Sequence, residues 1–181
     1  MHKLLIPFLL VLFFGQSMAQ SKVHYYEDKA RQPNEIKSEF PYDIPIRTAD
    51  NDTLNTADIF QKNDKPTLLL FWLTTCAPCR LEMKAISKKY DAWQAEKPFN
   101  MYAVSIDWPR NEEQFVSRVK ENNWPFPAYL DFNREFWKIM PGRLNGLPQV
   151  FLLNKDGEIA HHKRKYRPGD EDQLFELLKG L

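Results

Sequence analysis

The sequence predicts an α/β fold in which a mixed central sheet is flanked by helices. Along most of the chain, short apolar runs of strand length alternate with amphipathic segments of helical periodicity, which is typical of strands joined by crossover helices. Near the C-terminus the pattern changes to strand, tight turn and strand, followed by a closing helix. A hairpin of this kind adds antiparallel strands, so a sheet of mixed orientation is expected.

The first expected elements are two short strands around the turn-forming residues 50–52, followed by a short helix capped by Thr56. Segment 67–73 is apolar throughout, as in a strand that is covered on both faces. Segment 99–107 is expected to be a second buried strand. The remaining pattern predicts helices at 77–93, 111–123, 133–140 and 170–181, and strands at 127–131, 149–154 and 158–164.

The N-terminal segment is typical of a secretory signal peptide. Lys3 precedes the apolar run 4–14, and small residues follow at Ser17 and Ala19, where a signal peptidase would cut. As a helix the run spans roughly 16 Å, too short for a hydrocarbon core of about 30 Å, so membrane attachment is expected only if the segment stays uncleaved. The sequence thus predicts a signal peptide at 1–19, an irregular polar leader at 20–45 and the folded domain at 46–181.

The charge of the predicted mature chain is balanced. Loss of Lys3 leaves 24 of the 25 basic residues against 24 acidic ones, which gives no support for binding to nucleic acid or to an anionic membrane surface. The basic run 161–167 is interpreted as the solvated end of a strand with its turn, and a docking patch for an acidic partner is the alternative. We expect a monomer.

The chain has two cysteines, Cys76 and Cys79, at the start of the predicted helix 77–93. Two thiols at this spacing can form a disulfide, supply half of a metal site or be coincident core residues. A structural disulfide across so short a loop constrains the unfolded chain little. Structural zinc needs four Cys or His ligands, and the neighbours His161 and His162 would point to opposite faces of a strand. A redox role therefore explains the pair best.

The chemistry of a redox pair follows from the position of the two thiols. Residues three apart on a helix have Cβ atoms about 5–6 Å apart, near enough for a disulfide. Cys76 lies at the helix start, where free N–H groups and the helix dipole favour a thiolate, so it is expected to attack the substrate. Cys79 lies one turn deeper and is expected to resolve the mixed disulfide. Pro78 is tolerated because the first helical turn needs no N–H donors.

The stretch around these cysteines resembles thioredoxin. A buried strand that ends in Phe71-Trp72 leads to Cys-x-Pro-Cys, and "NGLPQVFLLNKDGEI" is similar to the proline loop and hairpin of that fold. An exported N-terminus with a hairpin, "CAPCRLEM" and "VSID" narrow the resemblance to the TlpA/ResA-like, AhpC/TSA-related thiol–disulfide oxidoreductases, over about residues 45–181. It implies a thioredoxin-like fold with an N-terminal hairpin extension and no cofactor or metal. It also implies that the protein lies outside the cytoplasm, in a bacterial periplasm. There it is expected to exchange electrons with protein thiols and disulfides, with reduction of disulfides as the expected direction. An upstream redox partner would supply its electrons.

The resemblance also implies further site residues. Pro148 matches the cis proline that packs against the cysteines, and Leu147 before it would offer backbone hydrogen bonds to an extended substrate. Glu82 matches an acidic position of the family, and its spacing places it on or beside the buried stripe of the helix with no Lys or Arg three or four residues away. We expect a raised pKa and proton transfer near the thiols; the alternative is a boundary glutamate that bends out to solvent.

Two departures from thioredoxin favour a narrower range of substrates. Thr75 replaces the tryptophan before the first cysteine, and Leu70 replaces the buried acid, so the proton transfer would fall to Glu82. A peroxiredoxin is excluded, because neither cysteine has the proline and the Thr or Ser that its motif requires. The alternatives carried forward are a copper-delivery or haem-maturation binding module on the same fold and a redox-inert interaction protein.

Overall fold

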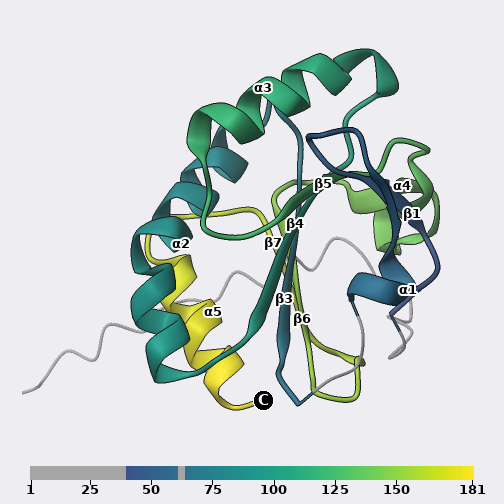
Figure 1. Ribbon diagram of the computed structural model, residues 1–181. Coiled ribbons are helices and arrows are strands. Elements are labelled where there is room, and N and C mark those ends of the chain that lie inside the picture. The colour runs from purple at the N-terminus through teal and green to yellow at the C-terminus, as the bar shows by residue number, and fades with distance from the viewer. Residues whose placement is uncertain (1–39, 61–63) are drawn as a thin grey trace, which may run out of the picture. The chain divides into compact units, whose positions relative to one another are not determined.

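A seven-stranded mixed sheet organises the computed structural model of the protein (Figure 1), which describes residues 40–60 and 64–181. The strand order is β2-β1-β5-β4-β3-β6-β7. The strands are β1 (Pro45–Arg47), β2 (Thr53–Asn55), β3 (Thr67–Trp72), β4 (Asn100–Ser105), β5 (Ala128–Leu130), β6 (Gln149–Leu153) and β7 (Ile159–Arg164). The helices are α1 (Thr56–Ile59), α2 (Ala77–Glu96), α3 (Glu112–Asn122), α4 (Glu135–Ile139) and α5 (Asp170–Lys179), with 3₁₀ turns η1 (Pro109–Asn111) and η2 (Pro141–Leu144).

The sheet has the mixed orientation that the sequence predicts. β3 pairs in parallel with β4, and β4 pairs in parallel with β5, whereas β6 runs antiparallel to both β3 and β7. The N-terminal hairpin β1–β2 joins the same sheet through an antiparallel pairing of β1 with β5. The predicted hairpin extension is therefore an edge of the main sheet.

β3 lies at the centre of two hydrophobic cores, one on each face of the sheet. All six of its residues are buried, and because side chains alternate between faces, Leu68 and Leu70 join one core while Leu69 and Phe71 join the other. The first core is completed by α2, α3 and α5, and the second includes α4 (Figure 1). This double cover explains why the strand carries no polar alternation.

The predicted cap of α1 is wrong by one residue. Asn55 caps the helix, since its Oδ1 atom accepts a hydrogen bond from the backbone N–H of Ala57 at 2.8 Å. Thr56 is the first helical residue, and its hydroxyl instead accepts a hydrogen bond from the backbone N–H of Ile44 at 2.9 Å. Asn and Thr both cap helices well. Thr56 is buried against the chain before β1, where its hydroxyl is already used, so Asn55 is left to cap the helix.

Two parts of the N-terminal prediction fall outside the described residues: the signal peptide at 1–19 and most of the leader, up to residue 39. The described end of the leader contributes to the second core, where Phe40 and Ile44 are buried. Within the described ranges, no helix has the length and apolar character needed to cross a membrane.

Candidate active site

The two cysteines form a disulfide at the N-terminus of α2, with their Cα atoms 5.3 Å apart. Cys76 is the N-cap residue, and its Sγ atom lies 3.3 Å from the backbone nitrogen of Cys79, which donates to it. Cys76 is partly exposed, whereas Cys79 is fully buried in the core. Only the first sulfur is therefore open to another protein, and it lies at the positive end of a 20-residue helix.

The loop that carries Cys76 is tied to the end of β4 by a buried carboxylate. Asp107 accepts hydrogen bonds from the backbone N–H of Thr74 at 2.8 Å, from its hydroxyl at 3.0 Å and from the hydroxyl of Ser105 at 2.6 Å. Arg80 adds a second tie, because its guanidinium donates to the carbonyl oxygen of Thr74 at 2.7 Å. The string "VSID" does not by itself indicate this anchoring role of Asp107.

The predicted proline loop lies beside the first cysteine. The Leu147–Pro148 bond is cis, and Leu147 lines the same pocket as Thr75 and Cys76. The carbonyl oxygen of Pro148 accepts a hydrogen bond from the backbone N–H of Lys165 at 2.7 Å, which fixes the loop to the chain after β7. Among the described residues the backbone of Leu147 has no hydrogen-bond partner, so it is free to pair with an added strand.

Glu82 is fully buried, which overturns the alternative of a side chain bent out to solvent. Its Oε1 atom lies 3.4 Å from the ammonium nitrogen of Lys163, and its buried Oε2 atom has no hydrogen-bond partner among the residues that the structure describes. Burial raises the pKa of Glu82 to about 7; Lys163 lowers this pKa, and the carboxylates of Asp170 and Glu171 raise it. A carboxyl one helical turn beyond Cys79 thus titrates near neutral pH, where a proton carrier works best.

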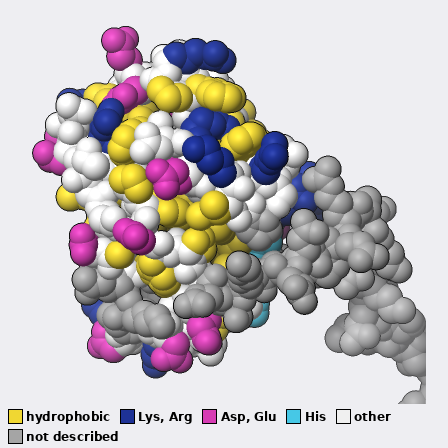
Figure 2. Space-filling view, turned by 90° about the vertical axis from the view of Figure 1, so that its right-hand side faces the viewer, with side chains coloured by type: hydrophobic (Ala, Val, Ile, Leu, Met, Phe, Trp, Pro, Cys, Tyr) yellow, Lys and Arg dark blue, Asp and Glu magenta, His cyan; other side chains and the backbone are white. Residues whose placement is uncertain are grey.

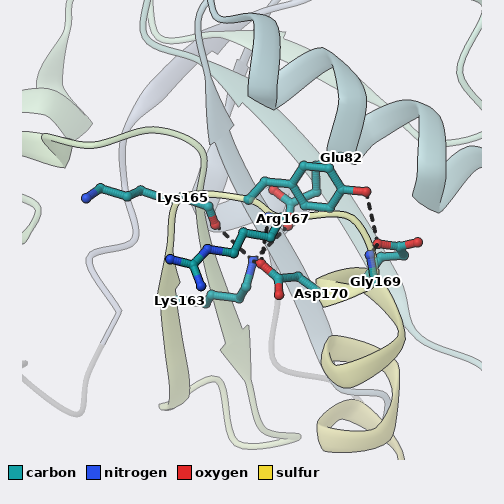
Figure 3. A network of polar contacts seen from close by, with 8 residues as sticks. Glu82, Lys163, Lys165, Arg167, Gly169 and Asp170 are labelled. Atoms are coloured by element: carbon teal, nitrogen blue, oxygen red, sulfur yellow. Dashed lines mark hydrogen bonds and ion pairs between the residues drawn. The ribbon is translucent and has the colours of Figure 1, made fainter. Parts of the chain in front are cut away.

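Lys163 links Glu82 to a polar network formed by β7 and the start of α5 (Figure 3). Its ammonium group also lies 2.9 Å from a carboxylate oxygen of Asp170 and donates to the carbonyl oxygen of Lys165 at 2.9 Å. Beside this group, Glu171 accepts a hydrogen bond from the hydroxyl of Tyr166 at 3.0 Å. With 24% of its side chain exposed, Lys163 reaches from the buried carboxyl of Glu82 to the surface.

Sequence reasoning missed Lys163 for a physical reason. The helical neighbours of Glu82 offer no cation, as predicted, but the partner comes from a strand 81 residues later in the chain. Lys163 lies in the basic run 161–167, whose interpretation as a solvated strand end does not hold for this residue, because its side chain is mostly buried and paired. Helical spacing predicts only neighbours on the same helix. The contact between Glu82 on α2 and Lys163 on β7 depends on how the helix packs against the sheet, which one sequence does not show.

The described residues contain no group of three or more His, Cys, Asp or Glu side chains placed to hold a metal ion. His162 stacks on Phe151 and its Nε2 atom lies 2.9 Å from the amide oxygen of Gln149, within the sheet. Among the described residues, a copper-delivery site would have only the two cysteines as ligands.

Comparisons with known proteins agree with this geometry. Residues 36–162 match the model of the AhpC/TSA family. Sporulation thiol-disulfide oxidoreductase A of Bacillus subtilis is 28% identical over 147 residues, covering 81% of this chain and 84% of that protein. Thiol-disulfide oxidoreductase ResA of Bacillus thuringiensis is 30% identical over 120 residues, which covers 65% of this chain and slightly less than two thirds, 64%, of that protein.

Solved structures give the same fold. An uncharacterized thioredoxin-like protein from Porphyromonas gingivalis superposes with a TM-score of 0.67 at 28% identity, covering 80% of this chain and 92% of that one. StoA from Bacillus subtilis superposes with a TM-score of 0.57 at 26% identity, covering 76% and 96% of the two chains. The thioredoxin-like fold that the sequence predicts is confirmed.

Proposed function

The chain belongs to the AhpC/TSA family as a thiol–disulfide oxidoreductase, and on that premise we propose that it works outside the cytoplasm, where its Cys76–Cys79 pair reduces disulfides of client proteins. One observation carries the proposal. A partly exposed cysteine caps the first turn of α2 and is bonded to a fully buried cysteine one turn deeper. That asymmetry separates an attacking thiol from a resolving thiol.

In the proposed cycle the reduced protein attacks first through Cys76. Its thiolate forms a bond to one sulfur of the client disulfide, and the other client sulfur leaves as a thiolate that takes up a proton. The thiolate of Cys79 then attacks the Cys76 sulfur, which restores the intramolecular disulfide and releases the second client thiol. The client gains two electrons, and an upstream thiol partner returns two electrons to the protein.

Two further residues act around this exchange in the proposal. Leu147 presents its unpaired backbone groups to an extended client segment, next to the sulfur that the client must reach. Glu82 exchanges the proton that Cys79 loses when it resolves the mixed disulfide, because its pKa of about 7 lets it hold or release a proton near neutral pH. Lys163 positions the Glu82 carboxyl and connects it to the surface.

The extracytoplasmic location rests on the N-terminal sequence pattern. Lys3, the apolar run 4–14 and the small residues up to Ala19 have the order of a signal peptide. Expression of the full chain in a bacterium, followed by mass spectrometry of the periplasmic fraction, tests this. A mature N-terminus at Gln20 supports export and cleavage, and an intact chain in the membrane fraction supports an uncleaved anchor.

The redox function is tested by equilibrating the purified protein with glutathione at a series of thiol-to-disulfide ratios and trapping the free thiols. We expect a reversible two-electron transition of the pair. A reduction potential toward the thioredoxin end of the range, roughly −270 mV, supports the reducing direction, whereas one near −120 mV assigns an oxidising role. A pair that never exchanges, or that binds zinc stoichiometrically, overturns the proposal.

A further inference from the structure

The pocket beside Cys76 has a wall made of aromatic and cationic side chains. Its volume of about 490 Å³ falls in the range of sites that bind small ligands or side chains. The guanidinium of Arg134 lies 4.0 Å from the ring centre of Trp108 and 4.8 Å from that of Trp137. Arg143 lies over the same Trp137 ring, at 5.1 Å. The two arginines and two indoles thus form one stack along the pocket.

These side chains are held in place by the fold. Arg134 is 9% exposed, and one of its terminal nitrogens donates to the carbonyl oxygen of Ile106 at 2.5 Å. Its Nε atom is buried and has no hydrogen-bond partner within residues 40–60 and 64–181. Arg143 and Leu144 both adopt left-handed backbone conformations, with φ of 52° and 53°, which non-glycine residues rarely adopt. Trp108 remains 49% exposed beside this stack.

Arg134 lies within electrostatic range of the carboxylates of Asp131 and Asp107, whereas Arg143 has no carboxylate partner in the described part of the chain. Neither Arg134 nor Arg143 forms an ion pair there, and both line the pocket. Asp107 is the pocket's carboxylate, but it is buried and its oxygens accept three hydrogen bonds from Thr74 and Ser105. Figure 2 shows the face that carries α4 in Figure 1, where Lys and Arg side chains gather among hydrophobic ones.

We propose that this pocket selects client proteins that carry an aspartate or glutamate close to the reactive cysteine. The inference rests on the proposed function and names the clients of the same site. A carboxylate is planar and accepts two parallel hydrogen bonds from a guanidinium, and Arg143, which is exposed, offers this group in the pocket wall. Cys76 and Arg143 line the same pocket, and a compact cavity of about 490 Å³ is roughly 10 Å across. Because an extended chain advances about 3.3 Å per residue, the acid lies within about three residues of the client cysteine.

The test uses peptides with one cysteine, each linked to the neutral leaving group 2-thiopyridine as a mixed disulfide. Reduced protein converts each peptide to its thiol, releases the thione and is itself oxidised to the Cys76–Cys79 disulfide, so absorbance under excess peptide gives the second-order rate constant of this single turnover. Aspartate and asparagine are compared at each position from three before to three after the cysteine. At one position or more we expect the aspartate peptide to react about 10- to 100-fold faster, as charge-assisted hydrogen bonds allow, and we expect added salt to reduce the preference.

The deciding quantity is the ratio of the aspartate rate to the asparagine rate in each variant. Arg143→Gln should bring this ratio close to one, and Arg143→Lys should retain part of it. Lys138→Gln is the matched control, since Lys138 is exposed on α4 and does not line the pocket; it should keep the wild-type ratio.

Three results overturn the inference while the proposed function stands: a wild-type ratio of one at every position, an unchanged ratio in Arg143→Gln, or an equal loss in Lys138→Gln. Failure of the wild-type protein to react with any peptide would overturn the proposed function itself, and this inference with it.

Discussion

At the residue scale, the two sulfurs of the active site differ in exposure and in electrostatic environment. Cys76 caps α2 and lines the pocket, whereas Cys79 is in the first turn of α2 and its side chain is buried in the core. A helix N-terminus lowers the pKa of a thiol such as that of Cys76, whereas apolar surroundings raise the pKa of a buried thiol such as that of Cys79. The first cysteine should therefore carry the thiolate in the reduced protein, and the second should ionise only when it resolves the mixed disulfide.

We predict that Cys79→Ser traps clients as stable mixed disulfides and that Cys76→Ser traps none. The exposed Cys76 still attacks in the first variant, but no second thiol is left to release the client. Non-reducing electrophoresis of each variant after incubation with oxidised client proteins checks this. If iodoacetamide at mildly acidic pH labels Cys79 faster than Cys76 in the reduced wild type, the two roles are reversed.

We predict that Glu82→Gln shifts the pH profile of Cys76 alkylation to lower pH and slows turnover near neutral pH. A negative carboxylate in this buried site opposes a second negative charge on sulfur, so its removal makes the thiolate easier to form. Turnover should fall by up to about 100-fold, the lower end of the roughly 10²–10⁴-fold that general acid–base assistance contributes, because Glu82 acts on the resolving thiol and not on the client.

Glu96→Gln is the matched control for that variant, since Glu96 lies on the same helix with its side chain 57% exposed. It should leave both the alkylation profile and the turnover unchanged. An unaltered profile in Glu82→Gln would remove Glu82 from the chemistry and leave it a structural carboxyl.

The sequence alone predicts the residues whose role depends on local spacing. The redox pair follows from a three-residue step at a helix start, and the burial of Glu82 follows from its place beside the stripe of Cys79 and Met83. Lys163 and Asp107 escape prediction, because each meets its partner through the register of the sheet. Long-range pairs of this kind leave no periodic signal in one sequence.

At the element scale, long apolar or amphipathic segments are predicted well and short ones less precisely. β3 is observed one residue shorter than the expected 67–73, and α2 extends three residues beyond the expected end at residue 93. The turn after α4 is harder to foresee, since η2 contains successive left-handed residues at Gly142 and Arg143. Glycine, and to a smaller extent Asn and Asp, signal such a conformation in a sequence, and an arginine such as Arg143 does not.

The contact between α2 and β7 gives an element-scale prediction. Lys163→Met should raise the pKa of Glu82 further above about 7. In the wild type the charge of Lys163 lowers this pKa, whereas Asp170 and Glu171 raise it, and the variant keeps only the two raising effects. The pH profile of turnover should move to higher pH by the same amount. Carboxyl ¹³C NMR of protein labelled at glutamate follows the Glu82 titration directly.

Lys155→Met serves as the control for this change, because Lys155 is exposed in the turn between β6 and β7. It removes the same charge from the hairpin without touching the buried carboxyl, so the titration of Glu82 should not move. An identical shift in both variants would mean that net charge, and not the Lys163 contact, sets this pKa.

At the scale of the whole molecule, the active site costs the protein stability. Glu82 has an ordinary pKa of 4.5, which burial raises to about 7 in the folded protein. The folded state therefore holds this proton more tightly than the unfolded state does. The stability of the protein is highest below pH 4.5 as far as this group is concerned, and it falls as pH rises to about 7. A tenfold change in proton affinity is worth about 1.4 kcal/mol, so the loss is on the order of 3 kcal/mol.

We predict that Glu82→Gln removes this loss, so that the variant gains free energy of unfolding relative to wild type as pH rises from 4.5 to 8. Glu171→Gln should show the opposite sign in a lower pH window, losing free energy of unfolding relative to wild type as pH rises to about 4.5 and keeping that loss without further change up to pH 8. Burial alone would raise the pKa of Glu171, but hydrogen bonds from its own backbone and from Lys89, Tyr166 and Gly169 lower it. The ionised Glu171 therefore stabilises the fold above its unfolded pKa. Urea unfolding of the oxidised proteins at several pH values measures both trends, and parallel curves for Glu82→Gln and wild type would show that the buried carboxyl carries no such cost.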